Sequence, residues 1–362
     1  MALNELINQI VDVQIRNVTS NTYSRDLNTI AVLAKHDVFT APELYRVYQG
    51  SSAMAEDGFD LESYAYNAVR LIFSQEITPV NVVVGRVAVS GVNADYLTAF
   101  NQLLMIPQGW LWLISDLRDT TTQVTLAGLV ETNDKMYLAA TDKAVALTDL
   151  DTTDLSSKVK ALSYGNTACW FDDKIGKGTD LAPLPNYSEA ALLGRCANGI
   201  AGTVNFRLKR LVGVTVAPSV DSLTKMKTLE DKGYTFTANI EQSVRSYGST
   251  KTGSGEWIDT VLSIIWLKTN IRERVFATIA NSEKLPYETE GAAAIEADVR
   301  SVIAQGQGYN IVADDTPISV TTPNIRDLTP AQRNTRILPN VRFSCRLSGA
   351  INGTVIRGEV FA

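Results

Sequence analysis

Residues 60–87 contain the pattern that decides the fold, because "DLESYAYNAVRLIF" at 60–73 is followed by "VNVVVGRV" at 80–87. Apolar side chains recur at helical spacing in the first stretch, which predicts an amphipathic helix with Asp60 as its N-cap. The stripe of that helix is Leu61, Tyr64, Ala65, Ala68 and Ile72. The second stretch is a nearly continuous apolar run, which is typical of a strand buried on both faces. A helix followed by such a strand indicates an α/β layer.

The same alternation extends on both sides of this pair. We expect further strands at 29–33, 109–115, 136–140 and 167–171, and further helices at 94–104, 124–132, 155–164 and 188–201. Strands that alternate with helices form mostly parallel sheets. Residues 21–205 are therefore predicted to form a mostly parallel α/β unit.

The second half of the chain has a different pattern and predicts an α+β domain over residues 206–340. Helices are expected at 221–232, 256–280 and 291–304, and strands at 233–240 and 309–313. The glycine- and serine-rich stretch "SYGSTKTGSG" at 246–255 has no regular period and predicts a loop. Residues 316–340 contain four prolines, which favours an extended linker.

Amphipathic strand patterns occur near both ends of the sequence. Apolar and polar residues alternate over 10–18 and again over 341–348, and a turn at Gly353 leads into a further segment at 354–361. We interpret residues 1–20 and 341–362 as extended β-strand arms. Such strands either complete the sheet of their own chain or add to the sheet of a neighbouring chain, since unpaired strand edges recruit other chains.

Composition and charge exclude several classes of protein. A chain of 362 residues with 45% hydrophobic and 20% charged residues can bury a sizeable core. A net charge of −6 argues against a nucleic-acid partner or an anionic membrane surface, both of which require a basic patch. The sequence has no signal-peptide pattern, no apolar run long enough to span a membrane, and three widely spaced cysteines. These features favour a soluble intracellular protein.

Residues that could carry chemistry are sparse, and we predict no catalytic, cofactor-binding or metal-binding residues. His36 is the only histidine, and no GxSxG motif supplies a nucleophile. The carboxylate pairs Asp172–Asp173 and Asp314–Asp315 are interpreted as loop and capping residues, although catalysis by carboxylates alone stays open. The five tryptophans lie in or beside apolar patterns and are expected in the core.

Three stretches resemble contractile phage tail sheath proteins. In 45–87 the resemblance lies in Gly58, Glu62, Ser63, Tyr64, Ala68, Phe73, Ser74, Gln75, Pro79, Gly85 and Arg86. In 189–214 it lies in an alanine-rich helix and a strand with Lys209 and Gly213, and in 253–310 in a Gly–x–Trp–Ile–Asp segment, a long helix and a Pro–Tyr–x–x–x–Gly turn. The ordered motifs cover most of residues 40–310.

This resemblance implies a structural subunit that polymerises helically around a tail tube and is not an enzyme. Contraction of such a polymer drives the tube through the host envelope and delivers the genome. The implied partners are other copies of the chain, the tail tube protein, and the baseplate and tail terminator proteins, without cofactors, nucleic acid or membrane. The implied location is the virion tail, after assembly in the host bacterial cytoplasm.

The resemblance also implies roles for particular residues. The terminal arms of sheath proteins pair with the C-terminal domain of neighbouring subunits, which assigns inter-subunit strand exchange to Val11, Val13, Ile15, Val341, Phe343, Cys345 and Leu347. Arg272, Arg274 and Lys284 are candidates to face an acidic tube, with a solvated charged helix face as the alternative. Two other functions stay open: the sheath of an R-type bacteriocin or other contractile injection system, and a carboxylate-dependent hydrolase.

Overall fold

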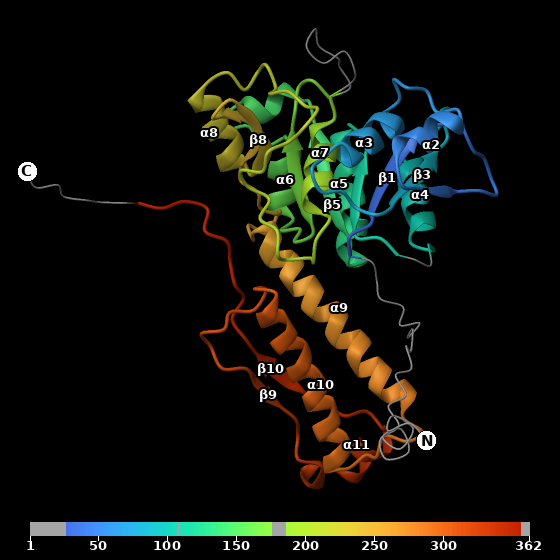
Figure 1. Ribbon diagram of the computed structural model, residues 1–362, viewed down its shortest axis with the longest axis vertical. Coiled ribbons are helices and arrows are strands. Elements are labelled where there is room, and N and C mark those ends of the chain that lie inside the picture. The colour runs from blue at the N-terminus through green and yellow to red at the C-terminus, as the bar shows by residue number, and fades with distance from the viewer. Residues whose placement is uncertain (1–26, 107–108, 176–185, 356–362) are drawn as a thin grey trace, which may run out of the picture.

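The structure, a computed structural model, describes residues 27–106, 109–175 and 186–355. Figure 1 shows a broad head, residues 27–257, above a narrow leg, residues 282–348. The long helix α9 (Ile258–Asn281) runs from the head into the leg. Because this helix belongs to both parts, its packing determines how the leg is attached.

The head is built on an eight-stranded sheet in the order β2-β3-β1-β4-β5-β6-β7-β8. The six central strands are parallel, and the edge strands β2 and β8 are antiparallel to their neighbours. This arrangement confirms the predicted mostly parallel sheet. The strands are β1 (Ile30–Lys35), β2 (Tyr45–Tyr48), β3 (Val82–Val87), β4 (Trp112–Ser115), β5 (Met136–Thr141), β6 (Thr167–Phe171), β7 (Tyr234–Ile240) and β8 (Ser243–Gly248).

Helices cover both faces of this sheet, so each face has its own hydrophobic core. On one face lie α2 (Ser51–Glu56), α3 (Tyr64–Phe73), α7 (Ser188–Cys196) and the first half of α9. On the other lie α4 (Asp95–Leu103), α5 (Thr120–Thr132), α6 (Leu155–Ala161) and α8 (Leu223–Lys232), near the short 3-10 helix η1 (Ala144–Leu147). Strands buried on both faces explain the near-continuous apolar runs in the sequence.

Helix α3 begins later than the sequence predicts. Ser63 is the N-cap, because its side chain accepts a hydrogen bond from the Tyr66 backbone N–H. Asp60 instead belongs to a turn, in which its carbonyl accepts from the Ser63 backbone N–H. Leu61 therefore precedes the helix and is exposed, whereas the rest of the predicted stripe is buried.

The leg is more ordered than the predicted linker. It contains α10 (Thr289–Gly308), β9 (Ser319–Thr321), the 3-10 helix η2 (Ile325–Asp327), α11 (Pro330–Asn334) and β10 (Arg342–Ser344). The predicted strand at 309–313 is wrong, because α10 continues to Gly308 and only Val312 forms a bridge, with Leu347. The loop predicted at 246–255 is corrected at its start, where β8 extends to Gly248.

The predicted boundary between residues 205 and 206 falls inside the head, because β7 and β8 complete its sheet. The hydrophobic core is also continuous from head to leg. The cluster that covers one face of the sheet includes Trp266 of α9 and Val299 and Val302 of α10. Among the helices described, none is both long enough and apolar enough to cross a membrane.

Candidate assembly surfaces

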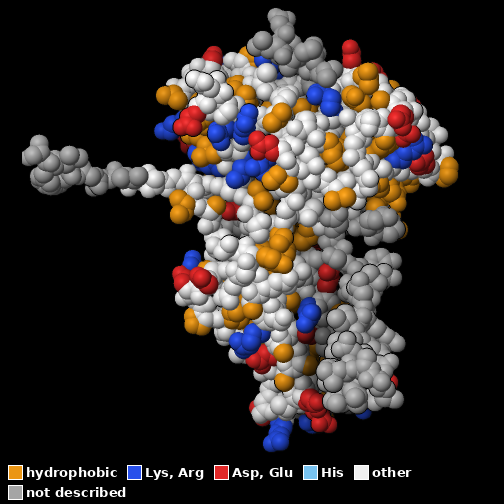
Figure 2. All heavy atoms as spheres, in the orientation of Figure 1, with side chains coloured by type: hydrophobic (Ala, Val, Ile, Leu, Met, Phe, Trp, Pro, Cys, Tyr) orange, Lys and Arg blue, Asp and Glu red, His pale blue; other side chains and the backbone are white. Residues whose placement is uncertain are grey.

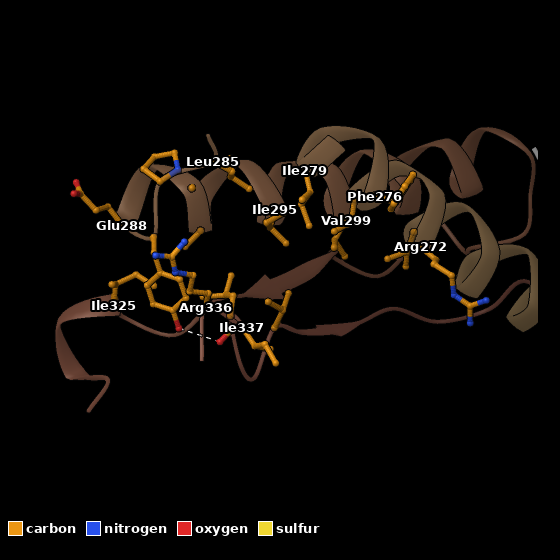
Figure 3. Close-up of a pocket in the computed structure, with 18 of the residues that line it drawn as sticks. Arg272, Phe276, Ile279, Leu285, Glu288, Ile295, Val299, Ile325, Arg336 and Ile337 are labelled. Atoms are coloured by element: carbon orange, nitrogen blue, oxygen red, sulfur yellow. Dashed lines mark hydrogen bonds between the residues drawn. The ribbon is translucent and has the colours of Figure 1, made fainter. Parts of the chain in front are cut away.

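An apolar groove of about 690 Å³ runs along the leg. Figure 3 shows its two walls, with Phe276, Ile279, Ile295 and Val299 on the helical side and Ile325 and Ile337 on the opposite side. The exposed fraction is 70% for Phe276 and 69% for Ile337. Large apolar side chains that remain exposed in a groove mark an interaction surface.

The groove follows from the local sequence of α9 and α10. Ile271, Val275 and Ile279 recur every four residues and form one stripe on the second half of α9. The loop 285–288 lies at one end of the groove. It packs so closely on the first turn of α10 that a Cβ on Gly291 would lie 2.0 Å from the Pro286 carbonyl oxygen. Only glycine at this position lets the 285–288 loop fold back onto the first turn of α10. The Tyr287 hydroxyl then donates to the Ile337 carbonyl across 3.0 Å and joins the two walls (Figure 3).

A small antiparallel sheet borders the groove. Strand β10 pairs with β9, so that Phe343 lies opposite Val320. Further along, the Ala313 N–H donates to the Arg346 carbonyl and the Ser348 N–H donates to the Ile311 carbonyl. A two-stranded sheet is marginal on its own and keeps unpaired outer edges, which suit a further strand.

The structure places the predicted C-terminal exchange residues against their own chain. Val341 and Phe343 line the groove, and Cys345 and Leu347 are half-buried against the core. One edge of this segment is therefore already used within the subunit. The other exchange positions, Val11, Val13 and Ile15, lie outside the described residues.

The segment from 349 to 355 behaves differently from the strand before it. It has no regular structure and leaves the body of the molecule (Figure 1). Ile351 is 88% exposed and Val355 is 83% exposed, while Asn352 accepts a hydrogen bond from the Asn205 amide. The described part of the predicted segment 354–361 is not a strand, and the remainder lies outside the described residues. Two apolar side chains are thus presented to solvent.

The three candidate tube-facing residues do not form one patch. Arg274 is paired within the leg, where its guanidinium lies 3.2 Å from Asp298 of α10. Arg272 is exposed at one end of the groove, and Lys284 is exposed in the loop after α9. Arg274 is therefore engaged by its own chain but is still exposed, as are Arg272 and Lys284.

The carboxyl edge of the parallel sheet, where open α/β sheets bind ligands, is occupied by the protein's own side chains. Next to the switch point between β1 and β4, the Asp116 carboxylate accepts from the Lys35 N–H and from the Tyr96 hydroxyl. Glu189 is fully buried and lies 3.1 Å from the Arg118 guanidinium. Burial raises the pKa of both carboxyl groups. These groups hold strand ends and α7 together.

The carboxylate pairs that left a hydrolase open do not converge. Asp172 is buried and accepts hydrogen bonds from Ser188 and Asn186, and burial raises its pKa to about 7. Asp173 instead accepts from the Ser219 N–H. Asp315 lies in the leg, where its carboxylate is 2.6 Å from Arg346.

His36 and the three cysteines are not part of a catalytic arrangement among the described residues. His36 packs against Phe39 and Phe59, and burial lowers its pKa to about 4. Cys169, Cys196 and Cys345 are free thiols. No cluster of His, Cys, Asp and Glu suited to a metal ion occurs within the described ranges.

Sequence reasoning missed the groove, although one signal was present. The apolar residues of the helix predicted at 256–280 continue to Phe276 and Ile279, which lie five turns beyond Ile258 and Val261 on the same face. Ile258 and Val261 are buried in the head, whereas Phe276 and Ile279 are exposed on the wall of the groove. An apolar stripe that continues beyond the head is the signal for a second surface along this helix.

A family model matches a part of the chain that includes α9 and part of the leg. Residues 258–318 match the E217 tail sheath protein gp31-like, C-terminal domain. The match covers α9, α10 and the connection to β9. No curated protein sequence matches the chain.

Solved structures extend the similarity to the whole fold. The chain is similar to the helical sheath of the anti-feeding prophage in its contracted state, with a TM-score of 0.67, 12% identity, and coverage of 96% of this chain and 98% of that chain. For the PVC sheath complex of an extracellular contractile injection system the TM-score is 0.66, with 11% identity and 96% coverage of both chains. A sheath tail protein from Listeria innocua gives 0.56, with 8% identity and coverage of 82% and 89%. The resemblance to tail sheath proteins is thus confirmed in the family match and in the fold.

Proposed function

We propose that this chain, which has the fold of contractile sheath proteins, is a structural subunit that polymerises helically around a tail tube and contracts. The observation that carries the proposal is the match of residues 258–318 to a tail sheath C-terminal domain, within a chain of which 96% aligns with a contractile sheath structure. Contraction drives the tube through the envelope of the target cell. In a phage this movement delivers the genome.

The leg is the proposed site of subunit linkage. An arm from a neighbouring copy adds to an open edge of the β9–β10 sheet, and its apolar side chains pack into the groove. Each added backbone hydrogen bond contributes a net ~0.5–1.5 kcal/mol. Val341 and Phe343 then form part of the receiving wall, while the exposed segment 349–355 begins the outgoing arm. Val11, Val13 and Ile15 stay predicted contributors from the N-terminal arm, as do Cys345 and Leu347 at the root of the C-terminal arm.

The other proposed partners follow from a sheath role. Arg272, Arg274 and Lys284 stay candidates for contact with an acidic tail tube, and Arg274 is exposed although it pairs with Asp298. Baseplate and tail terminator proteins bind the two ends of the polymer. We place the protein in the virion tail, after assembly in the host bacterial cytoplasm. A subunit with the same fold and contacts would also build the sheath of an R-type bacteriocin. Capsid and terminase genes beside its gene would distinguish a phage tail from a bacteriocin.

Negative-stain electron microscopy and sedimentation of the purified full-length chain test this function. We expect tubular polymers whose amount rises with protein concentration. A discrete particle of fixed size at every concentration would contradict the proposal and return attention to the hydrolase alternative, for which the diverging carboxylates Asp172 and Asp173 give no support.

A further inference from the structure

The two edges of the head sheet carry opposite charges. At the β8 edge lies a basic surface, here called the basic edge, which consists of Arg207, Lys209, Arg210, Arg245 and Lys251. At the β2 edge lies the acidic edge, which consists of Glu56, Asp57, Asp60 and Glu62. Figure 2 shows mainly basic side chains, with a few acidic ones among them, over α8 and β8, and acidic side chains with basic ones between them over α2 on the opposite side of the head.

The basic edge is poorly neutralised within the subunit. Residues 208–211 hydrogen-bond to β8 and place Arg210 directly opposite Arg245. Like charges in directly opposite positions destabilise a strand pair. Arg245 donates to the Ser243 hydroxyl and the Leu208 carbonyl, and no carboxylate lies within ion-pair distance of it among the described residues.

The other cations of the basic edge are only partly paired. Arg207 lies 3.0 Å from Glu230, and Arg210 lies 3.7 Å from an exposed Glu76. Lys251 stacks on the ring of Trp257, and neither it nor Lys209 has a carboxylate partner in the part of the chain that is described. A cleft of about 400 Å³ beside the edge is lined by the cations Lys160, Arg207 and Lys251 and by the carboxylates Glu230 and Asp231. The surface is therefore indented and has an excess of positive charge.

The acidic edge has the complementary character. Glu56, Asp60 and Glu62 are exposed, and none of them forms an ion pair with a described residue. Asp57 is bound by Arg46, whose guanidinium also binds Glu43. The adjacent strand β2 pairs only with β3, so this end of the sheet presents an unpaired strand edge.

The two edges cannot neutralise one another within a single molecule. Eight strands spaced about 4.8 Å apart separate them by roughly 34 Å. The screening length at physiological ionic strength is about 8 Å, so neither charge stabilises the other across the head. A neighbouring copy placed head to tail brings them together.

On these observations we propose that the basic edge of one head binds the acidic edge of a second copy of this chain. This inference rests on the proposed sheath function and adds a lateral contact between heads to the linkage through the legs. Such a contact joins two different surfaces, and repeated contacts of this kind that do not close into a ring produce a helix. Opposite charges on the two surfaces also disfavour contacts between like edges.

Charge reversal on the full-length chain tests the contact. Arg210→Glu with Arg245→Glu, or Glu56→Lys with Glu62→Lys, is expected to raise the protein concentration needed for polymers about tenfold at moderate salt. All four substitutions together are expected to restore assembly toward that of the wild type. Arg326→Glu with Arg333→Glu, which changes two exposed leg cations and alters net charge as the basic-edge variant does, serves as the matched control.

Zero-length carbodiimide cross-linking of mixed light and heavy isotope-labelled chains locates the contact directly. We expect cross-links between different copies that join Lys209 or Lys251 to residues 56–62. If the wild type forms tubes but neither edge variant differs from the control and no such cross-link forms, the lateral contact is overturned and the sheath function stands. If the wild type forms no polymer, both fall.

Discussion

At the scale of single residues, Gly194 shows how closely two helices of the head approach. A Cβ at this position would lie 2.5 Å from the Ile72 carbonyl oxygen. Helices α3 and α7 therefore contact each other through backbone atoms. The sequence could predict both helices from their apolar spacing, but it could not predict this crossing, since a glycine inside a helix carries no signal of its neighbour.

Gly194→Ala is expected to lower the free energy of unfolding by about 1–3 kcal/mol, because the added methyl group must displace a backbone. Chemical denaturation measures the change. Gly349→Ala is the control, since no atom lies within 4 Å of a Cβ placed at Gly349. Equal stability of the two variants would show that α3 and α7 separate without cost.

Asp172 predicts a dependence of stability on pH. Burial raises the pKa of its carboxyl group from 3.8 to about 7, so the folded protein retains this proton when the unfolded chain has lost it. The unfolded state then binds fewer protons between pH 4 and pH 7, and stability falls as pH rises through this window. In Asp172→Asn, the free energy of unfolding should fall less between pH 4 and pH 7 than in the wild type, by up to about 4 kcal/mol. Denaturation of both proteins at pH 4.5, 6 and 7.5 measures the difference, and parallel pH profiles would contradict the assignment.

At the scale of elements, the sequence predicted the central strands well and the short strands poorly. Strand β6 matches its predicted bounds, because an apolar run buried on both faces is visible without knowledge of its partners. Strand β9 has three residues and no apolar run of its own, and it was not predicted, whereas β10 lies within the strand predicted at 341–348 but is shorter than expected. Their pairing depends on contacts with α10 and with each other, which local sequence does not encode.

The candidate assembly surfaces were likewise predictable in part. The alternation at 341–348 was visible, and the half-buried Cys345 and Leu347 agree with it. The partner strand was not visible, because β9 lies within the proline-containing segment that was interpreted as a linker. The groove depends on how α9, α10 and residues 325–343 meet in space. No single segment could have predicted it.

Two deletions distinguish the role of strand β10 from the role of the exposed C-terminal arm after it. Removal of residues 349–362 is expected to leave the thermal stability of the subunit unchanged and to abolish polymers, because β10 and its hydrogen bonds are retained. Removal of residues 341–362 should also expose the leg to proteases, since β9 then has no partner. Thermal denaturation, limited proteolysis and negative-stain microscopy provide the measurements. Tubes formed by either deletion variant would refute the role of the C-terminal arm.

At the scale of the whole molecule, α9 is the connection between head and leg. Ile258 and Leu262 are buried in the head, whereas Phe276 and Ile279 are exposed along the leg. Between them, Trp266 packs its ring against Tyr309 beyond the end of α10, with ring centroids 5.9 Å apart. The helix and the shared core therefore hold the two parts in one orientation.

A break in α9 should uncouple the two parts. Asn270→Pro removes the helical hydrogen bond to Trp266 and costs about 3 kcal/mol within a helix. We expect a folded head, rapid proteolysis of the leg and no tubes. Asn270→Ala retains the backbone bond and is the control. If Asn270→Pro resists proteolysis and assembles as well as the control, the connection through α9 is not required.

The hydrophobic core that runs without interruption from sheet to leg has a mechanical consequence. An interior packed at crystal-like density transmits strain and does not bend like a joint. We therefore expect the subunit to turn as one rigid body, so that a torque applied to the leg rotates the head through the same angle. In the proposed sheath, the energy for contraction would then be stored in the contacts between subunits, and each subunit would keep its shape while the sheath shortens.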